Sequence, residues 1–392
     1  MRFSVCVNTI VFSLLSGFQL ADAQPAPPRV FLVDAATLAA QKAHPDHELL
    51  ELAKAEADAA MKQKPLTITD KAKIPPSGDK HDYVSMARYF WPNPATKDHL
   101  PYIRKDGQTN PEIHDLPDHE YLDHIANSSR ALALGWYLTG DERYAEHAAL
   151  LLRVFFLNPD TAMNPNLEYA QYVPGVNTGR GTGILDARGL AIAVDAVGLL
   201  ARSRSWTAAD DQGMHAWMAK YYTWLRGSAH GHDEEKATNN HGSWYAAQAA
   251  SIAMFLGKTD DARAIAERVS TERIPSQFDA AGLQKLELAR TNSFSYSAFN
   301  LEALTELAQI VSATGVDLYA SKPGIIAGLD ALMPYDAQHP WPHEQIGKDM
   351  EGSVCPALIR VAAHTHEAKY VEDEPRYGCK VNAETWIEAH TR

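Results

Sequence analysis

The strongest constraint on the fold is a series of paired helical patterns that starts near residue 120. The first three pairs cover residues 120–140 with 142–157, 183–203 with 207–227, and 239–257 with 260–274. A fourth pair covers 297–315 with 324–335, and residues 39–63 add one helix ahead of the series. Apolar residues recur in these segments at three- and four-residue intervals, and glycines stand just past helix ends.

Successive helical hairpins joined by short turns predict an all-α fold. The expected architecture is an (α/α) toroid or incomplete barrel of about six to seven hairpins with functional loops. Loop-like or extended stretches interrupt the pattern at 64–118, 158–183, 276–292 and 364–392, and residues 283–289 alternate like a strand. Loops on a helical scaffold often carry function, so the unusual residues in these stretches are candidates for a site.

Residues 1–23 have the layout of a cleaved secretory signal: Arg2, a short apolar stretch, and the small-residue ending Ala-Asp-Ala at 21–23. We therefore expect a single domain over residues 24–392 that is periplasmic or secreted. Cys355 and Cys379 are the cysteines left after cleavage. In an oxidising compartment they either form one disulfide or stay as two thiols.

The chain carries 36 basic and 49 acidic residues, a formal charge of −13. A general binder of nucleic acid or of anionic membranes needs a basic surface, so neither partner is expected. A polyanionic substrate is compatible with this charge if the basic residues are concentrated in one cleft. The sequence leaves the oligomeric state open.

Common catalytic signatures are incomplete. His119 and His124 resemble the zinc motif H-E-x-x-H but stand five residues apart. On a helix this spacing separates them by roughly 140°, against roughly 40° in the true motif. Residues 230–235 could hold a metal but are more typical of a solvated polar loop, and the glycine-rich residues 179–184 follow no strand. No cofactor and no metal are expected at the site, and a structural metal elsewhere stays open.

The segment 77–94 interleaves Lys80, His81 and Arg88 with several aromatic residues. Aromatic faces stack on pyranose rings while cations meet carboxylates, so this composition suits a sugar acid. A long ordered loop pinned by its aromatic residues explains the same pattern equally well.

Two further segments place polar residues at expected helix starts. Residues 237–246 would begin a helix with Asn240 and His241 in its first turn, where free N–H groups and the helix dipole favour an anion. In residues 286–304, Arg290 and Tyr296 are six apart and converge only if a loop enters a helix near Ser295. Simple helix caps with a packed histidine and a surface arginine are the alternatives.

Four motifs in order resemble the alginate lyase family of bacterial polysaccharide lyases, and most closely its glucuronan- and alginate-cleaving members. The motifs are SGDKHDYVSMARYFWPNP (77–94), PGVNTGRGTGILDARG (174–189), ATNNHGSWY (237–245) and ELARTNSFSYSAFNLEAL (287–304). The resemblance covers roughly residues 64–345. It implies an (α/α) toroid with a deep groove, a uronate polymer as substrate and metal-independent β-elimination, which leaves a 4,5-unsaturated uronate end.

The resemblance also implies roles for single residues. Asn240 and His241 would neutralise the uronate carboxylate, and Tyr296 would take the C5 proton, protonate the leaving O4, or do both. For α-L-guluronate, whose proton and leaving group lie on opposite faces, His241 would be the base and Tyr296 the acid. Arg290 would lower the pKa of Tyr296 and bind near the carboxylate. Lys80, Asn177, Arg180 and Asn239 are expected to bind substrate or support the site.

Two other functions remain open at the level of sequence. A glycoside hydrolase on a similar helical scaffold would need two carboxylates, for which Asp82, Asp186 and Glu287 are candidates. A non-catalytic periplasmic binder of acidic glycans would keep the groove without turnover. The products distinguish the three, because a lyase leaves unsaturated sugar ends and a hydrolase saturated ones.

Overall fold

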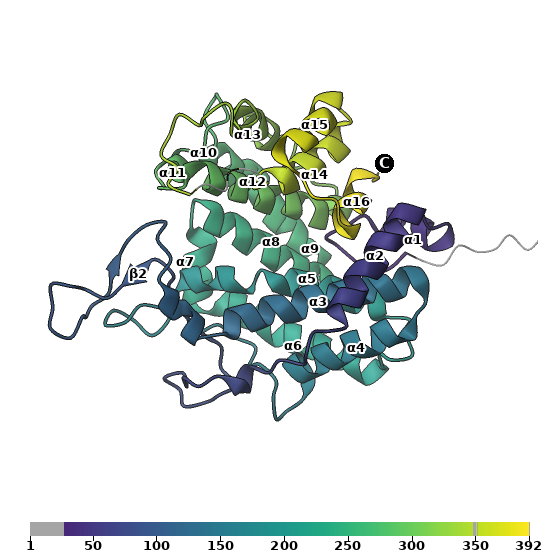
Figure 1. Ribbon diagram of the computed structural model, residues 1–392, viewed down its shortest axis with the longest axis horizontal. Helices are drawn as coiled ribbons and strands as arrows, with labels where there is room; N and C mark the ends of the chain where they lie inside the picture. Colours follow the sequence, from purple (N-terminus) through teal and green to yellow (C-terminus); the bar gives the residue numbers. More distant parts are fainter. Residues whose placement is uncertain (1–26, 348–349, 351, 392) are drawn as a thin grey trace, which may run out of the picture.

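The computed structural model describes residues 27–347, 350 and 352–391, so the predicted signal at 1–23 lies outside the described residues. The described chain is mainly helical with four short strands, which confirms the all-α class (Figure 1). No helix among the described residues is long and apolar enough to cross a membrane.

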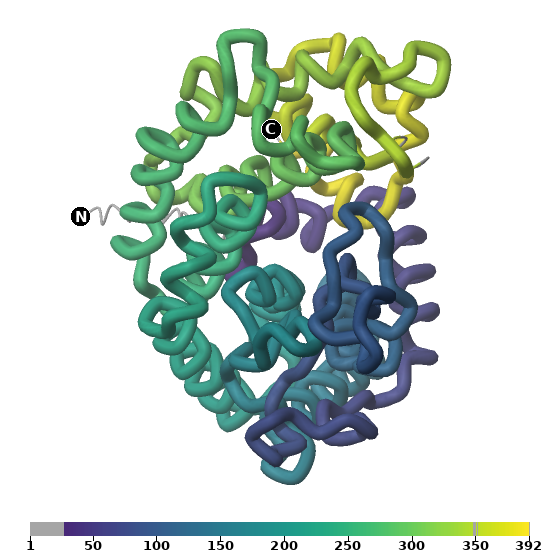
Figure 2. The backbone as a smooth tube through the Cα atoms, turned by 90° about the vertical axis from the view of Figure 1, so that its left-hand side faces the viewer, coloured from purple at the N-terminus to yellow at the C-terminus, as the bar shows by residue number. Residues whose placement is uncertain are grey.

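Seven helices contact one another in an order that returns to its start. The order runs from α2 (His47–Ala60) through α3 (Asp118–Thr139), α5 (Gly189–Leu200), α8 (Asn240–Phe255), α12 (Ser293–Ile310) and α14 (Cys355–Thr365) to α16 (Ala383–Ala389), which packs on α2. Figures 1 and 2 show the C-terminal helices beside the N-terminal ones, as this order requires. The number of hairpins and the toroid itself stay predictions.

Further helices follow the members of this series along the chain: α4 (Glu142–Leu152) after α3, α6 (Ala208–Gly227) after α5, α9 (Thr259–Arg268) after α8 and α13 (Ile325–Leu332) after α12. The α5 sequence is apolar on nearly every face because α5 contacts α3, α4 and α8. Asp195 is its polar exception, and its buried carboxylate accepts hydrogen bonds from the N–H groups of Phe31 and Leu32 at 2.8 and 2.9 Å.

Four sequence expectations about local structure are wrong. The single helix at 39–63 divides around Pro45 into α1 (Ala35–Ala43) and α2, which Asp46 caps. Residues 283–289 form the short helix α11 (Lys285–Leu288) instead of a strand, and residues 230–235 lie in α7 (Ala229–Lys236) instead of a loop. The tail at 364–392 contains α15 (Ala368–Asp373) and α16, whose start is fixed by a capping box at Asn382.

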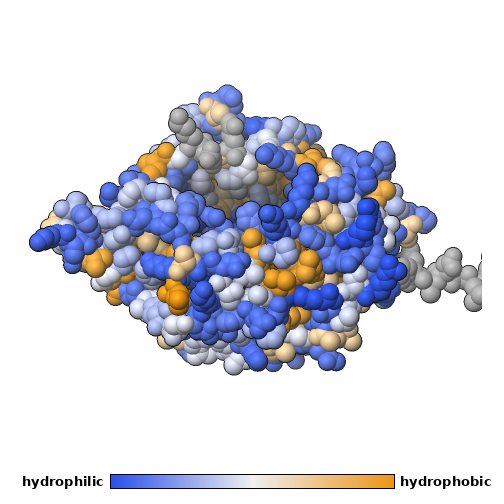
Figure 3. Space-filling view, turned by 60° about the horizontal axis from the view of Figure 1, so that its bottom comes forward, coloured by the Kyte–Doolittle hydropathy of each residue, from blue (hydrophilic) through white to orange (hydrophobic). Residues whose placement is uncertain are grey.

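The remaining elements are short. Strand β1 (Val84–Met86) pairs in parallel with β4 (Tyr169–Tyr172), and β2 (Phe90–Trp91) pairs antiparallel with β3 (Ile103–Arg104). The β2–β3 hairpin belongs to an arm, residues 88–110, that projects from the helical body in Figures 1 and 3. Short helices complete the chain: α10 (Ile274–Gln277), π-helical turns at Arg153–Leu157 and Val269–Arg273, and 3₁₀ turns at Ile68–Asp70, Pro111–Asp115, Gly181–Ala187, Ser312–Thr314 and Glu374–Tyr377.

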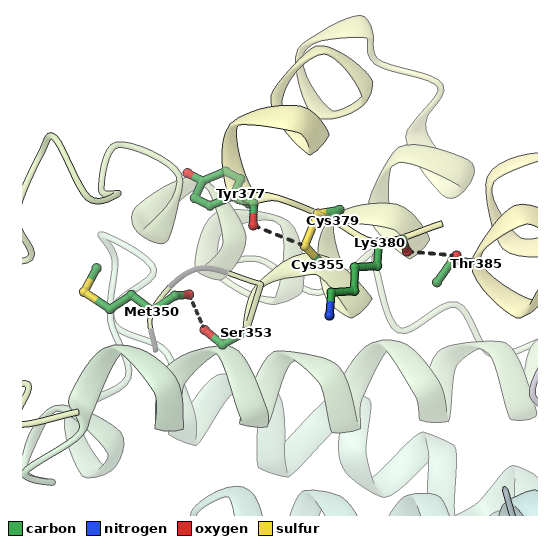
Figure 4. Close-up of a disulfide and its surroundings, with 7 residues drawn as sticks. All are labelled: Met350, Ser353, Cys355, Tyr377, Cys379, Lys380 and Thr385. Atoms are coloured by element: carbon green, nitrogen blue, oxygen red, sulfur yellow. Dashed lines mark hydrogen bonds between the residues drawn. A yellow bond between two sulfur atoms is a disulfide. The ribbon is translucent and has the colours of Figure 1, made fainter. Parts of the chain in front are cut away.

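Cys355 and Cys379 form a disulfide. Cys355 at the start of α14 is bonded to Cys379, 24 positions later and just ahead of α16 (Figure 4). Ion pairs add to this closure, because Arg360 of α14 contacts Glu388 at 2.7 Å and Arg130 of α3 contacts Glu384 at 2.5 Å. The C-terminal segment is therefore tied both to the last long helix and to the first helices of the contact series.

Candidate active site

The N-terminal ends of the neighbouring helices α8 and α12 carry the candidate residues. Asn239 caps α8 and its side chain accepts a hydrogen bond from the His241 N–H at 3.3 Å, so Asn240 and His241 lie in the first turn as predicted. The next position, Gly242, has no room for a side chain, because a Cβ there would lie 2.0 Å from both the Ala237 carbonyl oxygen and Arg273 Nη1. Arg273 occupies the space that a side chain would need.

His241 is paired with a buried carboxylate. Its Nδ1 lies 2.6 Å from Oε1 of Glu234, a side chain of α7 that is only 2% exposed. The structure shows no partner for Nε2 among the described residues, and 19% of the His241 side chain is exposed. A carboxylate on one ring nitrogen fixes the tautomer and leaves the other nitrogen able to take a proton.

Asn240 is buried and faces Glu287. Its backbone N–H and its Nδ2 each donate to the Glu287 carboxylate at 2.7 Å, and its Oδ1 is enclosed without a partner in the described structure. Burial raises the pKa of Glu287, while the hydrogen bonds from Asn240 and the charges of Arg290 and His241 oppose that rise. Glu287 is therefore close enough to interact electrostatically with both Arg290 and His241.

Arg290 and Tyr296 converge because α12 begins at Ser293, close to the expected start near Ser295. The Arg290 guanidinium carbon lies 3.7 Å from the centre of the Tyr296 ring. Asp106 of the arm accepts hydrogen bonds from Arg290 Nε at 3.0 Å and Nη2 at 2.7 Å. A second arm residue, Tyr89, places its hydroxyl 2.8 Å from the Tyr296 hydroxyl.

The surroundings of Tyr296 favour the neutral phenol. Burial raises its pKa above the ordinary value and the neighbouring Tyr89 adds to the rise, whereas Arg290 lowers it. Arg290 acts in the expected direction, but burial outweighs it. Asp106 also raises the pKa of Tyr296, while its own pKa is held well below the usual range by Arg290 and the Thr291 N–H.

Arg180 lies near the same site. Its guanidinium carbon is 5.2 Å from the centre of the Phe90 ring, and burial lowers its pKa while Asp186 and Glu234 oppose that effect. Gly181 allows the backbone next to Arg180 to pack against α7, because a Cβ at this position would lie 2.8 Å from the His230 carbonyl oxygen. Arg180 is therefore an electrostatic neighbour of the Glu234 that holds His241.

The other predicted residues have different surroundings. Lys80 is exposed, and no contact joins it to His241 or Tyr296 in the described part of the chain. Asn177 supports a turn, since its Oδ1 accepts the Val173 N–H at 2.9 Å. The three carboxylates considered for a hydrolase, Asp82, Asp186 and Glu287, are 8%, 7% and 1% exposed, respectively, and each accepts hydrogen bonds from protein groups.

Sequence reasoning missed Glu234, Tyr89 and Asp106 as parts of the site. Glu234 lies in the polar run 230–235, whose composition is more typical of a loop, and Tyr89 lies within the aromatic segment 77–94. Asp106 had no local signal. His119, which resembles part of a zinc motif in the sequence, has its Nε2 3.6 Å from Asp123. The described residues contain no group of three or more histidine, cysteine or acidic side chains able to hold a metal.

Comparison with known proteins gives a consistent result. The sequence profile described as Alginate lyase matches residues 67–341. The crystal structure of an alginate lyase from Bacteroides ovatus has 34% identity and a TM-score of 0.86, and the match covers 93% of this chain and 99% of that one.

More distant structures share the fold. An alginate lyase from a Sphingomonas species has 15% identity and a TM-score of 0.57, over 93% of this chain and 97% of that one. A histidine-to-alanine variant of an alginate lyase with the same designation, complexed with a tetrasaccharide, has 16% identity and a TM-score of 0.59, over 95% and 98%. No curated protein matches the chain.

Proposed function

Because this chain belongs to the alginate lyase family and is accordingly a polysaccharide lyase, we propose that it cleaves 1,4-linked uronates of alginate by β-elimination. The observation that carries this proposal is that a carboxylate-held histidine and a half-buried tyrosine with a raised pKa lie at the starts of two contacting helices. β-Elimination needs a base for the C5 proton and an acid for the leaving O4, and these two side chains supply both.

His241 is the proposed base. Its Nδ1 is occupied by Glu234, so Nε2 is the nitrogen that takes the C5 proton. The Glu234 carboxylate then stabilises the imidazolium that forms. Tyr296 is the proposed acid, since its raised pKa keeps the hydroxyl protonated in the free enzyme. This division of roles suits guluronate, whose proton and leaving group lie on opposite faces; on mannuronate or glucuronate, Tyr296 would serve as both base and acid.

The carboxylate of the reacting sugar must also be neutralised so that negative charge can spread into it. Arg290 is the cation beside Tyr296, and Asp106 accepts hydrogen bonds from its Nε and Nη2, which fixes the guanidinium at this place. Asn240 has an indirect role, because its amide nitrogen donates to the buried Glu287 instead of facing the substrate. The same arrangement supports the α8 turn that carries His241.

The closed order of helix contacts supports an (α/α) toroid, and Figure 3 shows a deep hollow with a mainly polar rim on one face of the molecule. We further propose that the mature chain is one domain over residues 24–392 and is exported to the periplasm or beyond. The Cys355–Cys379 disulfide supports export, because such bonds persist in oxidising compartments.

The test is to incubate the purified mature protein with polymannuronate, polyguluronate and glucuronan separately and to follow the ultraviolet absorbance of the unsaturated uronate. Mass spectrometry of the products identifies unsaturated or saturated ends. Rising absorbance with unsaturated ends on an alginate block supports the proposal. Saturated ends would point to a hydrolase, and binding without products would point to a glycan binder.

A further inference from the structure

Gln171 has an unusual backbone conformation close to the site. It lies in β4 with φ of +47°, a left-handed conformation that residues other than glycine, asparagine and aspartate rarely adopt. Such strain persists only where surrounding contacts over-determine it, and it concentrates at functional sites. The contacts made by Gln171 therefore indicate what the strained conformation holds in place.

These contacts connect a buried anchor to Arg180. Gln171 donates its Nε2 hydrogen to Asp186 Oδ1 at 2.7 Å and its backbone N–H to Ser85 Oγ at 2.8 Å. Its side-chain Oε1 accepts from Arg180 Nη2 at 2.9 Å, and its backbone carbonyl accepts from Arg180 Nε at 3.0 Å. One residue thus fixes both the direction and the plane of the guanidinium.

Asp186 makes this anchor rigid. Its carboxylate is 7% exposed and also accepts hydrogen bonds from the Tyr83 and Ser85 hydroxyls. The backbone around Arg180 is fixed in addition, since Gly183 lies against Ala170, where a Cβ would come within 2.5 Å of the Ala170 Cβ. A guanidinium held in this way loses little conformational entropy when it binds an anion.

The Arg180 guanidinium lies beside Phe90 of the arm. Its Nη1 makes no hydrogen bond among the described residues and is not among the enclosed polar atoms. The guanidinium stacks on Phe90 of β2, and the charge of Arg104 on β3 also reaches it. A planar cation beside an aromatic ring suits an acidic pyranose, whose ring stacks while its carboxylate accepts hydrogen bonds.

We propose that Gln171 is a positioning residue that presents Arg180 to the carboxylate of a second uronate, next to the sugar that reacts between His241 and Tyr296. The inference rests on the proposed lyase function. Arg290 meets the reacting carboxylate on the α12 side, whereas Arg180 lies beside Phe90 and Arg104 of the arm, where a neighbouring sugar of a bound chain would lie. The enzyme then requires two consecutive acidic sugars, which favours a continuous polyuronate over a polymer with alternating neutral sugars.

The test compares the KM and kcat of Gln171→Asn, Arg180→Gln and the double variant on the polymer that the wild-type enzyme cleaves best. Asparagine tolerates the positive φ but is one methylene shorter, so it cannot reach both Asp186 and Arg180. We expect each single variant to raise KM about tenfold, as loss of one charge-assisted contact would, with kcat within about threefold of wild type. The double variant should be no worse than Arg180→Gln, because Gln171 acts through Arg180.

His366→Asn is the matched control, since His366 also has a positive φ, of 56°, but lies at the end of α14. It should leave KM unchanged, and thermal melting of all variants reports on folding. An unchanged KM in either single variant, additive effects in the double variant, or a large fall in kcat would overturn the proposal. If Gln171→Asn does not fold, Gln171→Gly takes its place with the same expectations, because glycine accepts the positive φ and removes both side-chain contacts. A wild-type protein without unsaturated products would instead refute the lyase function itself.

Discussion

Replacing Glu234 by glutamine tests the proposed base. The change removes a negative charge 2.6 Å from His241 Nδ1 and keeps the size of a side chain that is 2% exposed. A hydrogen bond to a charged group contributes about 1.5–3 kcal/mol, against about 1 kcal/mol for a neutral one. The imidazolium in the transition state therefore loses about 1–2 kcal/mol of stabilisation, which corresponds to a fall in kcat of about 5- to 30-fold.

KM should change little, because Glu234 is too buried to touch the polymer. The assay is the initial rate of unsaturated-uronate absorbance at saturating polyguluronate, the substrate on which His241 is the proposed base. Glu235→Gln is the matched control: it removes the same charge from the adjacent position of α7, where Glu235 pairs with Arg226 and Arg268 at 2.9 Å each. A Glu234→Gln enzyme within about twofold of wild type, or an equal loss in the control at equal thermal stability, would refute the reasoning.

Three further predictions concern stability and its link to the site. A glycine-to-alanine change normally stabilises a helix. Gly242→Ala should instead lower both the melting temperature and kcat, because the new methyl group would lie 2.0 Å from Arg273 Nη1. A more stable and fully active variant would contradict this. Replacing Cys355 and Cys379 by alanine should cost about 3.5 kcal/mol of unfolding free energy from loop entropy, measured by denaturant titration, and no loss would contradict it. Burial raises the pKa of Glu306, a residue of α12, to about 8. The protonated side chain therefore contributes its full stability below the unfolded pKa of roughly 4.5, and this contribution is lost as the pH rises through 8. Glu306→Gln should melt higher than wild type at pH 9 but not at pH 5, and an equal shift at both pH values would contradict this.

Local features of the site could be predicted from sequence because they depend on neighbouring residues. The cap at Asn239, the first-turn position of His241 and the helix start that brings Arg290 to Tyr296 all follow from helix signals within a few positions. The errors at 230–235 and 283–289 arose where short polar or alternating segments carry too little periodicity to identify a helix.

The supporting contacts could not be predicted in this way, because they join distant parts of the chain. Asp106 and Arg290 are 184 positions apart, and Tyr89 and Tyr296 are 207 apart. No periodic pattern records such pairings, which arise only when the arm folds onto the helix ends. The same pairings determine the protonation of Tyr296, so the expected fall in its pKa could not be checked without the structure.

The most direct test of the central claim is the absorbance trace of Tyr296→Phe beside wild type on the polymer that wild type cleaves best. The variant removes one hydroxyl, which lies 2.8 Å from the Tyr89 hydroxyl, and should melt within a few degrees of wild type. We predict a flat trace together with retained polymer binding, because the leaving oxygen then has no proton donor. A trace that still rises at a substantial fraction of the wild-type rate would contradict the assignment of Tyr296 as the catalytic acid.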